Sequence, residues 1–431
     1  MDALNFPKYK ILFIKLSYIL GVVFSLFLFA IIFYNIAEFL SLNIYDILLM
    51  SWPALVFDLG RNIGKAFVLP VDVIIRFLKP PPDKFRPKLI SILIPAKNEE
   101  ETIGKCIESV LENDYPWKEI IVVDDGSEDN TYFIAKRYEE TKIVKVVRKD
   151  PSGFGASSIN YGLLFAKGEI ILRLDADTLI SRDSLEWIAR YFEDEKLVGA
   201  AGNLRVLNRD VNLLTKLQAY EYFISFEMGR RTQSLLRTLL IIPGATSIYR
   251  RSMLESLGLL DRALAEDFDT TLKFHKVRGR LIFAPEVLSW TEVPESWRSW
   301  IRQRIRWARG QLASLKRHGQ LFFRRRFGMP GLVGAPDMVL MDMASLFAWF
   351  IWLTWVILAR IPIFHLFTVL ITVYFYSELL AIATSRVVSR DPEPLRILLL
   401  FPLASFFYRP IHNIVRYIGY LEEILGKRVQ W

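Results

Sequence analysis

Long apolar stretches lie toward both ends of the chain, and a segment with short alternating patterns separates them. Residues 11–33 form an almost unbroken apolar run, about the length that crosses the roughly 30 Å hydrocarbon core of a bilayer. Residues 338–358 and 361–383 have the same character. We predict a transmembrane helix in each of these runs. Residues 395–420, interrupted by charged residues and a proline, make a poorer span.

Two further apolar stretches, residues 43–57 and 63–78, contain aspartates, basic residues and prolines. This pattern fits a second, kinked span, and it also fits amphipathic helices that lie at the membrane interface. The sequence leaves both interpretations open.

The pattern changes after residues 79–88, a proline-rich basic linker that marks a domain boundary. Beyond it, short β-rich runs alternate with helix-like stretches. The runs are residues 90–94, 120–123, 143–147 and 170–174, and the helix-like stretches lie near 100–113, 129–140, 155–166 and 181–194. This alternation predicts an α/β domain with a parallel sheet covered by helices on both faces. In such sheets, ligands collect beyond the carboxyl ends of the strands.

The composition indicates a chain that is part bilayer and part water-facing domain. Of its 431 residues, 52% are hydrophobic and 23% are charged. The net charge is +9, but the Lys and Arg residues crowd beside apolar stretches and form no single basic domain. Anionic lipid headgroups and phosphorylated substrates are therefore the expected partners, and nucleic acid is not. The only cysteine, Cys106, excludes an internal disulfide and is expected to be a small buried hydrophobe.

We therefore predict four regions: membrane and membrane-proximal segments at 1–78, the α/β domain at 79–294, amphipathic interface helices at 295–335 and a C-terminal membrane region at 336–431. Basic residues lie at the ends of the predicted spans, namely Arg324, Arg325, Arg326, Arg386 and Arg390. The positive-inside rule places them on the cytoplasmic side. We expect a multi-pass plasma-membrane protein whose α/β domain faces the cytoplasm.

Two acidic turns follow predicted strands. Asp175 and Asp177 can both reach a hard divalent cation such as Mg²⁺ or Mn²⁺, with substrate phosphate oxygens in its other positions. A lone Asp-Ala-Asp motif is more often a turn that caps a helix. Asp124 and Asp125 repeat the placement after another strand, where a carboxylate can accept from the imide N–H of uracil or from a ribose hydroxyl. Two such turns on neighbouring strands together predict a site for a nucleotide diphosphate.

A third acidic pair, Glu266 and Asp267, opens a helix-like stretch that runs to about residue 277. Asp267 is either a helix N-cap or a general base that takes a proton from an attacking sugar hydroxyl. If two carboxylates of the site bind a cation, the general base must be a third carboxylate that does not bind it.

On a helix, Gln303, Arg306, Trp307 and Gly310 share one face, because they lie at i, i+3, i+4 and i+7. Arg306 suits a diphosphate, and Trp307 offers a flat surface on which a sugar ring can stack. The many Trp and Arg residues of the same stretch are also typical of a helix on a membrane surface. The two interpretations are compatible if different faces of the helix serve the site and the bilayer.

Two glycine motifs are less specific. Residues 153–158 nearly form a dinucleotide fingerprint but lack its last glycine. Gly244, in Pro243-Gly244-Ala245, either lines an acceptor groove or forms a plain turn.

Together these motifs resemble glycosyltransferase family 2, in the membrane-embedded branch with a QxxRW signature, over roughly residues 89–431. That branch includes cellulose, hyaluronan and poly-N-acetylglucosamine synthases. The resemblance implies a GT-A type, Rossmann-like nucleotide-sugar-binding domain with transmembrane and interfacial helices. It also implies an inverting, metal-dependent transferase that uses Mg²⁺ or Mn²⁺ and a nucleotide-activated sugar, with a UDP-sugar favoured.

The resemblance gives each motif a role. The positions implied to contact the donor nucleotide-sugar are Pro95, Ala96, Glu99, Asp124, Asp125, Asp175 and Arg306. Asp175 and Asp177 would hold the metal, and Asp267 would be the catalytic base. The positions implied on the acceptor and gating side are Gln303, Trp307, Gly244 and Glu266.

One position departs from the family pattern. Many relatives carry a lysine where this chain has Gly155, so phosphate binding is expected to rely on the metal, Arg306 or another cation. The Gly-Phe-Gly-Ala string at 153–156 is closer to polyprenyl-phosphate sugar transferases. We expect a synthase that makes, and guides outward, a β-linked polysaccharide from a saccharide acceptor. The alternative is transfer of one sugar to a membrane lipid. A third hypothesis, a catalytically idle nucleotide-binding subunit, is disfavoured by the complete acidic set.

Overall fold

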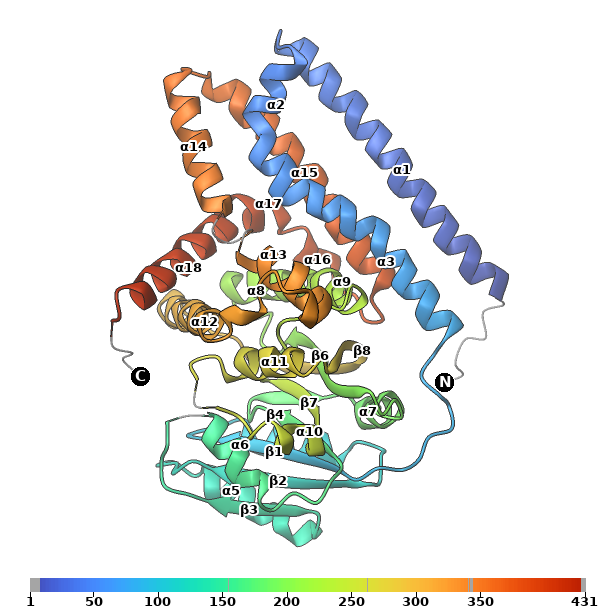
Figure 1. Ribbon diagram of the computed structural model, residues 1–431, viewed down its shortest axis with the longest axis vertical. Helices are drawn as coiled ribbons and strands as arrows, with labels where there is room; N and C mark the ends of the chain where they lie inside the picture. The colour runs from blue at the N-terminus through green and yellow to red at the C-terminus, as the bar shows by residue number, and fades with distance from the viewer. Residues whose placement is uncertain (1–7, 154, 262, 340, 342–343, 428–431) are drawn as a thin grey trace. The chain divides into compact units, whose positions relative to one another are not determined.

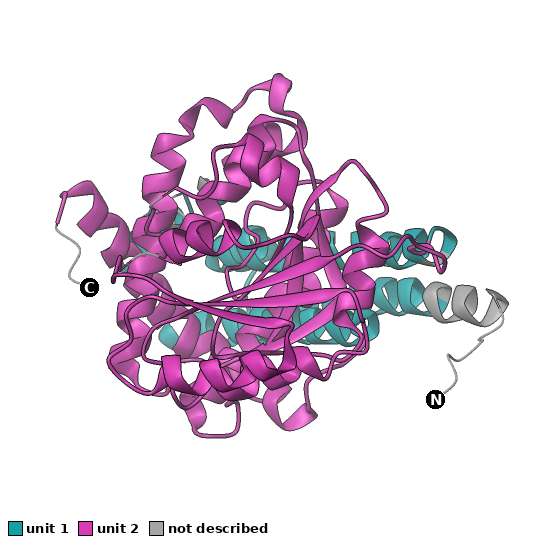
Figure 2. Ribbon diagram, turned by 90° about the horizontal axis from the view of Figure 1, so that it is seen from below, with its two compact units in different colours: residues 1–79, 337–389 teal, residues 80–336, 390–431 magenta. Residues whose placement is uncertain are grey.

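The computed structural model describes residues 8–153, 155–261, 263–339, 341 and 344–427. It divides into two compact units, Met1–Lys79 with Asp337–Ser389, and Pro80–Pro336 with Arg390–Trp431 (Figure 2). The second unit therefore takes in residues after 389, which the sequence analysis assigned to a C-terminal membrane region. The chain leaves the sheet-containing unit and later returns to it.

The first unit is helical. Its helices are α1 (Lys8–Phe39), α2 (Ile44–Pro53), the π-helical turn η1 (Ala54–Leu59), α3 (Gly60–Leu78), α14 (Ser345–Leu358) and α15 (Ile363–Val388), and α13 (Ala335–Val339) lies where the two units meet in the chain. Helices α2, η1 and α3 follow one another without a break. The stretch that the sequence left undecided is thus one continuous helix with a π-helical segment just after Pro53, at a point where the proline removes a backbone donor. Its buried Ile47, Met50 and Ala54 pack in one cluster with Val369 and Val373 of α15.

Three helical segments are long and apolar enough to cross a membrane, judged by length and composition over the described residues. They are Ser17–Phe39, Ile363–Val388 and Leu395–Ile424, which correspond to the expected runs at 11–33, 361–383 and 395–420. The expected span at 338–358 differs. Part of it lies outside the described residues, and α14 has 14 residues, fewer than the ~20 of a spanning helix.

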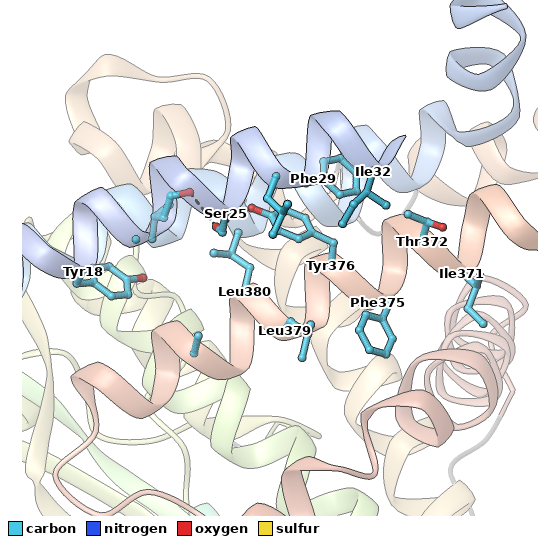
Figure 3. Close-up of a pocket in the computed structure, with 14 residues that line it drawn as sticks. Tyr18, Ser25, Phe29, Ile32, Ile371, Thr372, Phe375, Tyr376, Leu379 and Leu380 are labelled. Atoms are coloured by element: carbon cyan, nitrogen blue, oxygen red, sulfur yellow. Dashed lines mark hydrogen bonds between the residues drawn. The ribbon is translucent and has the colours of Figure 1, made fainter. Parts of the chain in front are cut away.

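A largely apolar cavity of about 720 Å³ lies between α1 and α15 (Figure 3). Phe29 and Leu380 are among the side chains that line it. A hydroxyl pair, Ser25 and Tyr376, bridges the two helices at 3.0 Å. Hydrogen bonding therefore holds α1 to α15 at a point where most of the surrounding surface is hydrocarbon.

The second unit is built on one eight-stranded sheet (Figure 1). The strands are β1 (Ile90–Ala96), β2 (Lys118–Asp124), β3 (Val144–Arg148), β4 (Ile170–Leu174), β5 (Thr178–Ile180), β6 (Leu197–Val206), β7 (Thr246–Arg250) and β8 (Arg280–Thr291). Their spatial order is β3-β2-β1-β4-β7-β6-β8-β5.

The sheet is mixed: the four strands expected to be parallel are so, and the later strands add antiparallel pairings. Strands β1 to β4 are parallel, as the alternation of runs and helices predicted. Strand β7 is antiparallel to both neighbours, and β5 is antiparallel to β8. The physical reason is connectivity: crossover helices join the first four strands, whereas the later strands follow other connections.

Helices pack against the sheet through apolar side chains. Those of the first half are α4 (Ile103–Leu111), α5 (Thr131–Arg137), α6 (Gly155–Leu163) and α7 (Ser184–Tyr191), with a short 3₁₀ turn η2 (Tyr138–Thr141). Ile92, Ile120 and Leu172 on the strands are fully buried in one cluster with Cys106 of α4. Cys106 is therefore a core residue, as expected. Gly162 lets α6 approach closely, because a Cβ there would lie 2.9 Å from Val123 Cγ2.

The later helices form a second group. They are α8 (Leu213–Ile224), η3 (Ser225–Arg230), α9 (Arg231–Leu235), α10 (Arg251–Ser256), α11 (Glu266–Lys276), α12 (Trp297–Arg317), η4 (Gly319–Leu321), η5 (Arg325–Phe327), η6 (Pro330–Gly334), α16 (Leu395–Leu398), α17 (Phe401–Leu403), η8 (Ala404–Tyr408) and α18 (Arg409–Ile424). Helix α12 crosses α18 at Gly419, whose missing Cβ would lie 2.7 Å from Ala308 Cβ and 2.9 Å from the carbonyl oxygen of Ile305. The last described helix of the chain therefore packs directly on α12.

Glu227 is the centre of a buried ionic cluster. Its carboxylate accepts from Arg205 of β6 and from Arg231 of α9, and Asn203 donates to it at 3.0 Å. Glu227 is 0% exposed. Such clusters tolerate the loss of one partner poorly, because a charge then stays buried with its counter-charge removed.

We therefore expect Glu227→Ala to lower the thermal unfolding midpoint in detergent markedly, in line with the ~3–5 kcal/mol typical of a broken buried pair. Glu112→Ala is the matched control, since Glu112 pairs with Arg182 and their side chains are 61% and 72% exposed. Its midpoint should be close to that of the wild type. Equal shifts for the two variants would contradict the assignment of Glu227 as a structural counter-charge.

Candidate active site

The ends of β1 and β2 bring the first group of expected residues together. Ala96 is the register partner of Asp124, Pro95 that of Val123, and the backbone N–H of Asp125 donates to the carbonyl of Ala96 at 2.9 Å. Asp124 is fully buried and pairs with Arg148 Nε at 3.0 Å. Pro95, Ala96, Asp124 and Asp125 thus form one corner at the carboxyl edge of the parallel strands.

Asp125 faces the loop that follows β3. Its carboxylate accepts from Lys149 Nζ and from the backbone N–H of Ser152 at 3.1 Å. Burial alone would raise the pKa of Asp125, but these hydrogen bonds hold it below its ordinary value. Asp125 thus ties the loop to the strand end through these hydrogen bonds.

Asp175 and Asp177 follow β4, and Glu99 faces them from the loop after β1. Burial, first, and then the charges of Asp175 and Glu99 raise the pKa of Asp177 to about 7. The pKa of Glu99 is also raised, by burial and then by carboxylates that include Asp175. Thr178 and Thr291 donate to Asp177 Oδ1 at 3.0 and 3.1 Å. The fold thus concentrates negative charge at this point.

Glu266 and Asp267 occupy the first turn of α11, and Ala265 is the N-cap. The N-cap alternative for Asp267 is therefore wrong, because its side chain reaches elsewhere. Asp267 Oδ2 accepts from the backbone N–H of Gly244 at 3.1 Å. Burial, then the neighbouring Glu266, raises the pKa of Asp267, and Arg173 opposes that rise. Gly244, expected on the acceptor side, thus contacts the candidate base through its main chain.

Two arginines beside this pair, the buried Arg173 and the half-buried Arg230, were missed by sequence reasoning. Arg173 of β4 forms ion pairs with Asp175 at 3.3 Å and with Glu266 at 3.0 Å. Burial lowers the pKa of Arg230, at the end of η3, to about 10, and Asp267 opposes that shift. A charged residue inside an apolar β run, as in Ile171-Leu172-Arg173-Leu174, was the available signal for Arg173.

Helix α12 is packed tightly against the entry to α11. A Cβ on Gly310 would lie 2.7 Å from Ala265 Cβ and 2.8 Å from the backbone nitrogen of Ala265. Only a glycine permits this approach without a shift. Gln303 and Trp307 lie on the same helix face as Gly310, two turns and one turn before it.

The expected α12 residues differ in their surroundings. Arg306 and Trp307 are exposed, Trp307 by 38% of its surface. Gln303 Oε1 is buried and has no hydrogen-bond partner among the described residues. No hydrogen bond or ion pair within the described ranges joins Gln303, Arg306 or Trp307 to the carboxylates at the strand ends. The three side chains are therefore available to a ligand but are not tied to the acidic groups.

Arg304, one of the arginines in the stretch that is also typical of a membrane-surface helix, lies in the protein interior. It is 3% exposed, pairs with Glu221 of α8 at 2.9 Å and stacks on the Trp307 ring at 4.4 Å from the centroid. Burial raises the pKa of Tyr222 to about 12, with Arg304 opposing the rise and Asp177 contributing to it. Tyr222 of α8 thus senses the charges of both Arg304 on α12 and Asp177 after β4.

The ligand atoms of the site indicate whether it suits a divalent cation. No group of three or more His, Cys, Asp or Glu side chains in the described part of the chain is arranged to hold a metal. Asp175 and Asp177 nevertheless provide hard oxygen donors, and their mutual repulsion is relieved by a cation. Mg²⁺ and Mn²⁺ sites of this type use one or two carboxylates and substrate phosphates. The residues therefore fit such an ion when a phosphorylated substrate is bound.

The architecture matches a solved structure. Mannosyltransferase PcManGT from Pyrobaculum calidifontis, solved in complex with GDP-Man and Mn²⁺, aligns with 88% of this chain and 100% of that chain, at a TM-score of 0.58 and 20% identity. At this identity the likeness shows the fold alone. The sheet-containing unit is thus a GT-A type α/β domain, as the resemblance implied.

The sequence comparison identifies the domain further. Residues 91–258 match the model of glycosyl transferase family 2, so the chain contains a domain of that family. Poly-beta-1,6-N-acetyl-D-glucosamine synthase of Staphylococcus epidermidis is 34% identical over 223 residues, which are 51% of this chain and 54% of that protein. The protein named probable glycosyltransferase YdaM of Bacillus subtilis is 34% identical over 246 residues, or 55% and 59% of the two chains. The chain thus spans little more than half the length of these curated relatives.

We expect Gly310→Leu to push α12 away from the loop before α11. The overpacking should lower the free energy of unfolding by ~1–3 kcal/mol. Hydrogen–deuterium exchange in the peptide covering residues 263–268 should become faster. The control is Gly319→Ala, since a Cβ at Gly319 has nothing within 4 Å. Unchanged exchange in the Gly310 variant would show that the helix does not depend on this contact.

Proposed function

We propose that this protein is a membrane-bound, inverting glycosyltransferase that uses a nucleotide-activated sugar and a divalent cation to build a β-linked polysaccharide. The observation that carries the proposal is the placement of carboxylates after β2 and β4 at one edge of the sheet, with Arg173 linking Asp175 to Glu266 beside Asp267, in a chain whose residues 91–258 match the family 2 model. The name of the Staphylococcus relative supports a polymer product, and that of the Bacillus relative supports glycosyl transfer. The apolar helices support a location in the membrane.

The donor nucleotide is proposed to lie along the carboxyl ends of β1, β2 and β4. The corner of Pro95, Ala96 and Asp124 is shaped by the strand register, so it offers the base and ribose a rigid surface. Asp125 and Glu99 complete this side. We favour UDP as the nucleotide, because a buried carboxylate can accept from the imide N–H of uracil.

Asp175 and Asp177 are the residues that would hold Mg²⁺ or Mn²⁺. When bound, the ion would neutralise the charge that develops on the departing nucleoside diphosphate. Arg306, exposed on α12, supplies a further positive charge for the same phosphates.

Asp267 is proposed to take the proton from the acceptor hydroxyl as that oxygen attacks the anomeric carbon. A single displacement of this kind inverts the anomeric configuration. The Gly244 and Phe268 N–H groups each donate to Asp267, at 3.1 and 2.7 Å, and so fix the direction of the carboxylate. Its raised pKa makes it a better proton acceptor than an ordinary aspartate.

The acceptor is proposed to approach along α12. Trp307 offers its ring to a sugar, and the buried, unpartnered Gln303 Oε1 offers an acceptor for a hydroxyl. Glu266 and Gly244 complete the acceptor side around Asp267.

The proposal is tested by incubating the detergent-purified protein with Mg²⁺ or Mn²⁺ and a panel of labelled UDP- and GDP-sugars, and then sizing the product in aqueous and lipid phases. A long water-soluble chain supports a polysaccharide synthase and identifies the donor. A single sugar in the lipid phase supports the alternative function, transfer to a membrane lipid. Absence of any nucleoside diphosphate release would remove the transferase proposal.

We expect Asp267→Asn to lower kcat by about 10²–10⁴-fold, the typical cost of losing a general base, since the remaining amide accepts no proton. Nucleotide binding, measured by fluorescence titration, should stay nearly unchanged. Asp269→Asn is the control on the same helix. Asp269 binds His318 at 3.0 Å, so that variant should lose stability and retain turnover. Retained turnover in the Asp267 variant would exclude the base role.

We also expect the Mn²⁺ affinity to depend on pH. A cation binds the ionised carboxylate, and the pKa of Asp177 is about 7. The apparent affinity should therefore be highest and level above about pH 7 and should fall up to about tenfold per pH unit below it, as protons compete with the ion. Electron paramagnetic resonance of free Mn²⁺ measures this directly. A flat profile between about pH 5.5 and 8 would contradict the placement of Asp177 at the cation.

A further inference from the structure

Of the two arginines near Asp267 that have no expected role, Arg173 is the one with defined carboxylate partners. Arg173 is 7% exposed and lies among three carboxylates. Its Nε is 3.3 Å from Asp175 Oδ1, and its Nη1 is 3.0 Å from Glu266 Oε1. Asp267 also acts on it electrostatically. One guanidinium thus connects the end of β4 with the first turn of α11.

Two glycines leave room for this side chain. A Cβ on Gly244 would lie 3.0 Å from Arg173 Cζ, and a Cβ on Gly155 would lie 3.4 Å from Arg173 Nη2 and 3.0 Å from Glu266 Oε1. Gly155 is the position at which the resemblance led us to expect a lysine. The space toward which a side chain at 155 would point is therefore already occupied by the Arg173 guanidinium and its partner Glu266.

We infer that Arg173 is a positioning residue that fixes Asp175 and Glu266 together and so sets the donor side of the site against Asp267. This inference rests on the proposed function. Arg173 acts through its neighbours, because Nε donates to Asp175, Nη1 forms an ion pair with Glu266, and its side chain is only 8% exposed. It engages Asp175 through Oδ1, and no other side chain of the described residues donates to Asp175, which leaves Oδ2 for a ligand.

The fork of an arginine suits this role better than a lysine does. Its planar guanidinium presents donors in fixed directions, so one side chain can hold two carboxylates at a constant angle, whereas an ammonium is a single point charge. Loss of the fork would let Glu266 and Asp175 move independently. A displacement of about 1 Å in a catalytic group can reduce turnover about a hundredfold.

The test compares Arg173→Lys, Arg173→Leu and the double variant Arg173→Leu/Gly155→Lys with the wild type. Arg250→Lys is the matched control. Arg250 lies on the neighbouring strand β7, opposite Ile170 at the far end of β4, and donates to main-chain carbonyls there. Two readouts are used: kcat and donor KM in the transferase assay, and hydrogen exchange of the peptides that contain Gly244 and Phe268, whose N–H groups donate to Asp267.

We expect Arg173→Leu to lower kcat about a hundredfold, with a change in donor KM below about threefold, because the interaction it removes orients groups and does not bind substrate. Arg173→Lys should fall between this variant and the wild type. Exchange at Gly244 and Phe268 should become faster in Arg173→Leu and stay unchanged in Arg250→Lys. The double variant should regain at least about tenfold in kcat, since a lysine at 155 starts beside Glu266.

Wild-type kcat in Arg173→Leu, an equal loss in Arg250→Lys, or a double variant no better than Arg173→Leu would overturn the inference. If the wild type itself transfers no sugar from any donor, the proposed function fails. The exchange measurement still decides the role of Arg173 in that case, since it needs no turnover: faster exchange supports the positioning role, and unchanged exchange refutes it.

Discussion

Crowding of like charges is the constraint on which the sheet-containing unit depends. Asp175, Asp177 and Glu99 converge after β1 and β4, and Glu266 and Asp267 lie close by at the start of α11. The clustered carboxylates do not by themselves stabilise the fold, because burial and mutual repulsion both oppose their ionisation. This concentration of negative charge needs positive charge beside it, either from a bound cation or from basic side chains of the protein itself. Arg173 supplies part of that positive charge where the two groups meet.

The second constraint is close approach. Helix α12 lies against the loop before α11, and Gly310 permits that distance. The opposite side of α12 is held by α18 through Gly419, which again has no Cβ. Arg304, buried between Glu221 and the Trp307 ring, fixes the rotation of the helix about its own axis. The signature residues are therefore positioned by steric fit on both sides.

Local patterns predicted the first half of the sheet well, because each strand from β1 to β4 is an apolar run that ends in a recognisable turn. They failed for β6, β7 and β8. Strand β6 is buried along its whole length yet contains Asn203 and Arg205, which pair with Glu227. A buried polar network obscures the hydrophobic signal of a strand, and its partners are distant in sequence.

The same limit applies to the site. The acidic motifs were evident, since each follows a strand or opens a helix. Arg173 and Arg304 were not evident from the sequence. Each pairs with a carboxylate that only the fold brings close to it. Arg304 in particular belongs to a run of arginines, and periodicity alone does not say which of them faces the interior.

The crossing of α12 and α18 also bears on biosynthesis. A ribosome delivers α12 well before α18, with the apolar helices α14 and α15 made in between. Until α18 emerges, the surface of α12 at Ile305 and Ala308 is uncovered. Helix α12, the proposed acceptor side, thus acquires its final support late in translation, so a nascent chain that has already folded β1 to β4 still lacks the final packing of α12.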